Sequence, residues 1–77
     1  MSTFTVRRDR RYRAKISLSM LQSFADNDLI AGKLIEAGFT DVSVSGSGGT
    51  RVAEARWPLT DATAPLPSEV VEITEIA

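Results

Sequence analysis

Residues 26–39 have the sequence DNDLIAGKLIEAGF, which predicts an amphipathic helix with a polar start and a glycine stop. We expect the helix to begin between Ser23 and Asp26, because serine and aspartate both cap helix N-termini. Gly38 supplies the left-handed residue that commonly ends a helix. The apolar residues predicted to share one buried face are Ile30, Ala31, Leu34, Ile35 and Ala37. A helix of about three turns is marginal alone in water, so this face must pack on an apolar surface.

The segments on both sides of this helix alternate between apolar and polar residues, which is typical of half-buried strands. Strands are expected at 11–20, 41–45, 50–57 and 69–76, and the glycine-rich turn at 46–49 predicts a hairpin between the second and third. The inward residues expected on the first and third strands are Tyr12, Ala14, Ile16, Leu18, Met20, Ala53, Ala55 and Trp57. On the last strand, Val71 and Ile73 are expected on one face and Val70, Glu72, Thr74 and Ile76 on the other. The sheet thus has one apolar face for the helix and one open face.

The predicted order is β-α-β-β-β, an α/β (α+β) two-layer sandwich with one helix on a mainly antiparallel sheet of three to four strands. This order corresponds to the first half of a ferredoxin-like arrangement, with a proline-containing loop at 58–68 in place of a second helix. Residues 1–10 are expected to be a basic N-terminal arm or the frayed start of a strand. Residues 11–77 are expected to form a single small domain, and this layout hosts too many functions to indicate one.

The composition excludes several kinds of chemistry. The 77 residues include neither cysteine nor histidine, which removes disulfides, thiolate metal sites and the commonest general base. The carboxylates are scattered along the sequence, and the serines have no obvious activating base. We therefore expect no catalytic activity, no cofactor and no bound metal. No apolar run approaches the roughly 20 residues that cross a bilayer, and a soluble, cytoplasmic protein is expected.

The charge is distributed unevenly along the chain. Residues 1–15 carry six cationic residues and one carboxylate, a net charge of +5, whereas residues 16–77 carry three and nine, a net charge of −6. Such asymmetry indicates an interaction surface, or pairing of the basic start with the acidic remainder. The residues expected to bind a partner or phosphate are Arg7, Arg8, Arg10, Arg11, Arg13, Lys15 and Arg56. Residues 46–51 are glycine-rich, but they join two strands, so a hairpin turn is favoured over a phosphate loop.

These patterns favour a small non-catalytic protein-interaction module, such as a subunit, adaptor or inhibitor. It would bind a protein partner through the basic arm, or through a sheet edge by strand addition. The alternative is a nucleic-acid-binding protein whose arginines neutralise phosphates, with a steep salt dependence. Against this alternative, Tyr12 and Trp57 are expected to point inward, where they cannot stack on bases. A membrane partner is not expected, and a homodimer through residues 69–76 is a further option.

Overall fold

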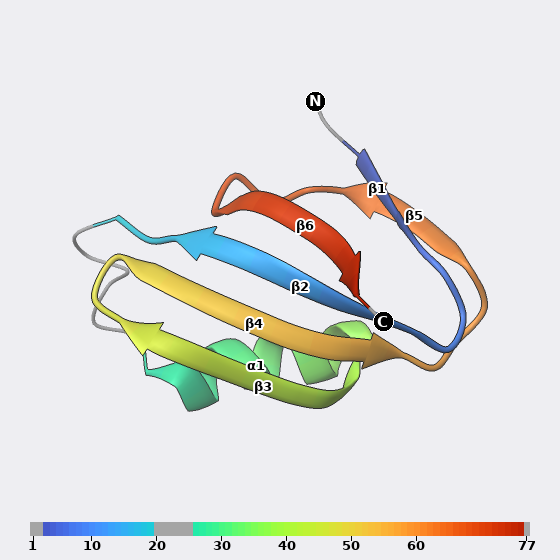
Figure 1. Cartoon of the computed structure of the whole chain (residues 1–77), viewed down its shortest axis with the longest axis horizontal. Helices are drawn as coiled ribbons and strands as arrows, with labels where there is room; N and C mark the ends of the chain where they lie inside the picture. Colours follow the sequence, from blue (N-terminus) through green and yellow to red (C-terminus); the bar gives the residue numbers. More distant parts are fainter. Residues whose placement is uncertain (1–2, 20–25, 77) are drawn as a thin grey trace.

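The computed structural model describes residues 3–19 and 26–76, and these residues form a mixed α+β structure with one helix and antiparallel sheets (Figure 1). The elements are β1 (Thr3–Val6), β2 (Arg10–Ser17), α1 (Asn27–Ala37), β3 (Thr40–Ser47), β4 (Thr50–Trp57), β5 (Ala62–Pro65) and β6 (Val70–Ile76). The predicted class, a single helix with mainly antiparallel strands, is confirmed.

The strands form two sheets, although one was predicted. The larger has the order β3-β4-β2-β6, and the smaller is the pair β1-β5. The smaller sheet arises because the alternating residues of β1 pair with β5, which lies within the segment 58–68 that was expected to be an irregular loop. In Figure 1, this pair lies beyond the end of the larger sheet where β2 begins and β4 ends.

The two central strands, β2 and β4, follow their predicted alternation closely. The bounds of β4 are those expected, and its residues Ala53, Ala55 and Trp57 are buried, as are Tyr12 and Ile16 on β2. The hairpin is also confirmed, since Ser47 pairs with Thr50 across Gly48 and Gly49. The first strand is shorter than predicted: β2 ends at Ser17, Leu18 lies beyond it, and Met20 lies outside the described residues.

The helix has the expected ends but not the expected buried face. Asp26 caps it by accepting a hydrogen bond from the backbone N–H of Leu29 (2.8 Å), and Gly38 ends it with φ 117°. No residue of α1 is buried. Ile35 is 59% exposed and Ala37 is exposed too, so their predicted burial is wrong. The reason is that α1 packs mainly against β3, an edge strand, which covers only part of its apolar stripe.

The last strand carries a second correction. Its pairing with β2 shifts between Lys15 and Ile16, which face Glu72 and Val70 respectively. A shift of this kind places an extra residue in one strand and turns the following side chains to the other face. Val70 and Ile73 therefore line the same apolar cavity, whereas Val71, predicted to share the face of Ile73, is 58% exposed.

The most buried cluster lies where the two sheets meet, rather than under the helix. It consists of Val6, Tyr12 and Trp57, with Phe4, Phe39 and Ile73 packed against it. Two edge-to-face ring contacts connect it, Phe4 with Tyr12 at a centroid distance of 5.4 Å and Phe39 with Trp57 at 4.9 Å. Such edge-to-face pairs stabilise beyond the area that they bury. The core therefore lies directly beside the β1–β2 turn, which contains Arg7 and Arg8.

Candidate functional site

Five arginines lie around the end of the larger sheet where β2 begins and β4 ends. Two come from the β1–β2 turn, two from the start of β2, and one from β4, directly opposite Arg11 in the strand register. We call this set the arginine cluster: Arg7, Arg8, Arg10, Arg11 and Arg56. The antiparallel pairing of β2 with β4 thus brings Arg56, remote in sequence, to the others.

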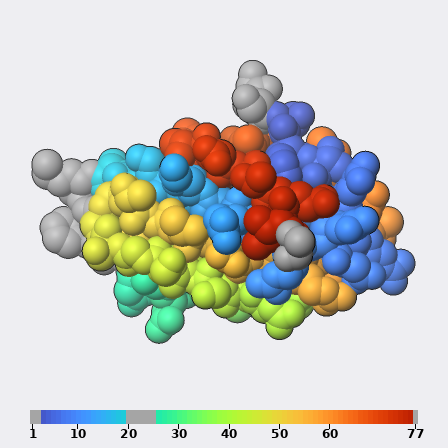
Figure 2. Space-filling view, viewed as in Figure 1, coloured from blue at the N-terminus to red at the C-terminus, as the bar shows by residue number. Residues whose placement is uncertain are grey.

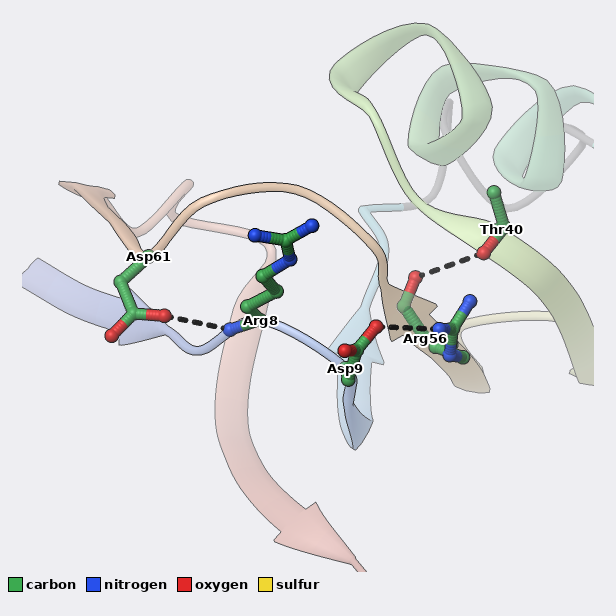
Figure 3. A network of polar contacts seen from close by, with 5 residues as sticks. All are labelled: Arg8, Asp9, Thr40, Arg56 and Asp61. Carbon is green, nitrogen blue, oxygen red and sulfur yellow. Dashed lines mark hydrogen bonds and ion pairs between the residues drawn. The ribbon is translucent and has the colours of Figure 1, made fainter.

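The backbone under the arginine cluster is fixed by hydrogen bonds to the core and to the β4–β5 connection. The Arg7 N–H donates to the Tyr12 hydroxyl (2.6 Å), and the Arg8 N–H donates to Oδ1 of Asp61 (2.7 Å; Figure 3). The Asp9 N–H donates to the Trp57 carbonyl (2.6 Å). Asp9 itself has φ 66°, a left-handed conformation that aspartate tolerates better than most residues. The turn is therefore tied to the chain at three successive residues.

The side chains of the arginine cluster are poorly neutralised. Arg56 forms an ion pair with Oδ1 of Asp9 at 2.5 Å, and the Arg56 carbonyl accepts a hydrogen bond from the Thr40 hydroxyl (Figure 3). Within the described residues, no ion pair involves the other four guanidinium groups. With the carboxylates of Asp9 and Asp61, the five arginines leave a local net charge of +3. Arg11 and Arg56 lie opposite each other, an arrangement of like charges that is destabilising.

The two remaining predicted site residues lie farther along β2 and are balanced by acidic neighbours. Nε of Arg13 contacts Oε2 of Glu54 at 3.2 Å, and Lys15 is paired in register with Glu72 on β6. Sequence reasoning thus grouped seven cations, of which the fold gathers five into one cluster. Sequence reasoning missed the ion pair of Asp9 with Arg56 and the hydrogen bond of Asp61 to the Arg8 backbone. For Asp9 a signal was available, because an aspartate within a run of arginines favours a turn.

The cluster borders the sheet face that α1 does not cover. Figure 2 shows this face, with residues of β6, β2, β4 and β3 side by side across it. Its polar side chains come from alternate positions of β2 and β4, including the Arg13–Glu54 pair. The aromatic residues of these strands, Tyr12 and Trp57, are buried on the opposite side. The open face therefore offers charge and hydrogen bonding but no ring on β2 or β4 for stacking.

The glycine-rich hairpin is not organised as an anion site. Arg51 is only 4% exposed, and its guanidinium donates to the Asn27 side chain (2.8 Å) and to the Gly48 carbonyl (3.2 Å). The Asn27 amide in turn donates to the Gly46 carbonyl (3.2 Å). These bonds tie the start of α1 to the hairpin, so this arginine serves the fold. Its burial was not foreseen from the sequence.

Two further classes of site can be assessed for the described part of the chain. Residues 3–19 and 26–76 hold no group of three or more acidic side chains placed to bind a metal ion. The helix that they contain, α1, lacks the length and apolar character needed to cross a membrane.

The arrangement can bind an anionic surface through several exposed guanidinium groups on a fixed backbone. In comparison with known proteins, no protein-family model, curated protein or solved structure matches this chain.

Proposed function

We propose that this chain is a small non-catalytic protein-interaction module that binds an acidic surface of a partner protein through the arginine cluster. The observation that carries the proposal is the concentration of five guanidinium groups, with a local net charge of +3, around a turn whose backbone is held at three successive residues. Guanidinium groups bind carboxylates in a bidentate geometry. A fixed backbone loses less conformational entropy on binding than a mobile arm would.

A protein partner is favoured over nucleic acid by what surrounds the cluster. Single-stranded nucleic acids are bound by stacking bases on exposed aromatic rings, and Tyr12 and Trp57 are buried. Nucleic acid is the second candidate, because five arginines are enough for several phosphate contacts.

The test is fluorescence anisotropy with two labelled probes, a glutamate-rich peptide and a single-stranded oligonucleotide, at low and at physiological ionic strength. Arg7→Ser combined with Arg8→Ser should weaken peptide binding by at least about tenfold. The matched control, Lys15→Ser with Lys33→Ser, removes the same charge elsewhere and should weaken it by less than about threefold. Equal losses in both variants would show a general charge effect and contradict the proposal. Tighter binding of the oligonucleotide than of the peptide would favour the second candidate.

We also propose that the larger sheet and α1 form a ferredoxin-like two-layer sandwich in one domain, with β5 and its flanking prolines in the place of a second helix. What supports this is the strand order β3-β4-β2-β6 with α1 between β2 and β3 along the chain. In this proposal the protein works in the cytoplasm, consistent with a sequence that contains no cysteine.

Dimerisation through β6 is the accompanying proposal for assembly. Within the described residues β6 pairs only with β2, so its other edge carries unpaired backbone groups, and Val71 is 58% exposed. Such an edge can pair with a second copy. Sedimentation analysis should then show a dimer for the natural chain and a folded monomer for Val71→Lys. A natural chain that is monomeric at high concentration would contradict this part of the proposal.

A further inference from the structure

A cavity of about 310 Å³ lies between the larger sheet, α1 and the β1–β5 pair. Within the part of the chain that the structure describes, its wall consists of fifteen residues, all of them apolar, contributed by six of the seven elements and by the segments after α1 and β5. None of the five residues of the arginine cluster is among them. The cavity is therefore a feature separate from the proposed protein-binding surface.

The cavity exists because small side chains face each other across it. In the β1–β5 register, Phe4 pairs with Ala64 and Val6 with Ala62, and all four line the cavity. On the opposite wall, Ala14 of β2 lies beside Ile73 of β6. Three alanines thus stand at positions where larger apolar residues would fill the space.

The β1–β5 pair has a polar side that faces away from this space. Thr5 and Thr63 pair in register between the apolar positions, and their hydroxyls are 2.6 Å apart in a hydrogen bond. Because alternate residues of a strand point to opposite sides, the β1–β5 pair is amphipathic, with its apolar side toward the cavity and its threonines on the other side. Its polar groups are consequently unavailable to anything inside.

The described side chains of the wall offer no partner for a charge or for ordered water. Among them, only Trp57 has a polar hydrogen, and its Nε1–H donates to the Thr60 carbonyl at 2.9 Å. An ordered water needs two to four polar partners, and a site with an apolar wall takes up apolar molecules in preference. The chemistry of the wall therefore selects an uncharged hydrocarbon.

We propose that this cavity binds a free, uncharged apolar small molecule of one to two rings. The volume decides the size: an apolar cavity of about 150 Å³ already binds benzene, and this one is about twice as large. The exposed members of the wall are Ala37 at the end of α1 and Ala62, Ala64, Pro65 and Pro67, so the opening lies between α1 and β5.

The test uses naphthalene as the probe. Its binding to the full chain is measured by methyl-group NMR and by thermal unfolding. Binding should shift the methyl signals of Ile16, Leu34 and Ile73, which line the cavity, and should raise the unfolding temperature, because a ligand of the native state stabilises it. 2-Naphthoate, the charged analogue, should leave these signals in place, since the wall contains no group to bind its carboxylate. Unshifted cavity methyls at saturating naphthalene would overturn the proposal.

A second test uses substitutions that fill the cavity. Ala64→Leu puts bulk into the cavity and should reduce naphthalene affinity at least about tenfold, whereas Thr63→Leu adds similar bulk to the other side of β5 and should leave affinity within about threefold. Ala14→Leu tests the opposite wall and serves if the Ala64 variant does not fold. Unchanged affinity in a folded filled variant would overturn the proposal. Cosedimentation with neutral phosphatidylcholine vesicles would overturn the assignment to a free molecule and point to a lipid chain.

Discussion

β4 and α1 are the two elements whose apolar patterns are clearest in the sequence, and they are buried to very different degrees. The four inward residues of β4 are all between 2% and 8% exposed; they are Arg51, Ala53, Ala55 and Trp57. In α1 no residue is buried, and Leu29 and Ile35 are more than half exposed. The strand lies between β3 and β2 and ends in the aromatic cluster, whereas the helix packs mainly on the edge strand β3.

This difference shows that burial is concentrated where the two sheets meet, and we expect stability to follow it. β4 has a neighbouring strand on each edge, so only its apolar face must be shielded from water by other elements. At the end of β4 that contains Trp57, residues of the β1–β5 pair and the aromatic cluster shield this face. A single helix cannot cover the rest of a four-stranded sheet, and the apolar cavity beside α1 is the space left over. We expect substitutions in the two elements to differ accordingly.

The largest effect is expected for Trp57→Ala. The change removes the ring contact with Phe39 and the Nε1–H bond to the Thr60 carbonyl, and it leaves a hole in the core. Buried aromatic-to-alanine changes cost about 3–5 kcal/mol, which is a large part of the stability of so small a domain. Urea unfolding followed by circular dichroism measures the loss. A loss below about 1 kcal/mol would contradict the assignment of the core to this end of the sheet.

Leu34→Ala should have a smaller effect, although Leu34 belongs to the predicted buried face of the helix. Leu34 is half-buried and lines the cavity, so part of its surface is in contact with open space in the native state. We expect a loss of about 1–2 kcal/mol, below the range for fully buried leucines. The same urea titration measures it. A loss as large as that of Trp57→Ala would show that α1 and β4 are equally important to the core.

Two glycines allow a matched comparison within the helical region. A Cβ on Gly38 would lie 3.1 Å from the Trp57 ring and the residue has φ 117°, whereas a Cβ on Gly32 would meet nothing within 4 Å. Gly38→Ala should therefore cost about 1–2 kcal/mol. Gly32→Ala should stabilise by about 0.5–1 kcal/mol, because alanine loses less backbone entropy in a helix. Shifts of the same sign in thermal unfolding would contradict the geometry at one of the two positions.

Much of the fold follows from local patterns in the sequence. The bounds of β4, the stop at Gly38 and the hairpin between β3 and β4 all rest on interactions within a few residues, and all were predicted correctly; the helix N-cap, Asp26, lies within the predicted range from Ser23 to Asp26. The burial of Ile35 and the face of Val71 were predicted wrongly, since both depend on packing and pairing partners that are distant in sequence. Periodicity indicates that a helix has an apolar side, but not how much of that side its neighbours cover.

The candidate site was predictable to a similar degree. The arginine run between 7 and 11 is visible in the sequence, and the antiparallel register adds Arg56 to it. The same register places Glu54 opposite Arg13 and so selects that arginine as its ion-pair partner. What the sequence could not show is the fixing of the turn by Tyr12 and Asp61, because those hydrogen bonds need the tertiary fold.

The smallest effect is expected for Ile35→Ser, which tests the helix side of the comparison directly. Isoleucine and serine have similar helix propensities, so the change reports mainly on burial. Since Ile35 is 59% exposed, its free energy of unfolding should stay within about 0.5 kcal/mol of the natural chain. Urea unfolding with Leu29→Ser as a second exposed position gives the measurement and its control. A loss above about 2 kcal/mol for Ile35 alone would mean that this face of α1 is covered in solution, and the contrast between the helix and β4 would then disappear.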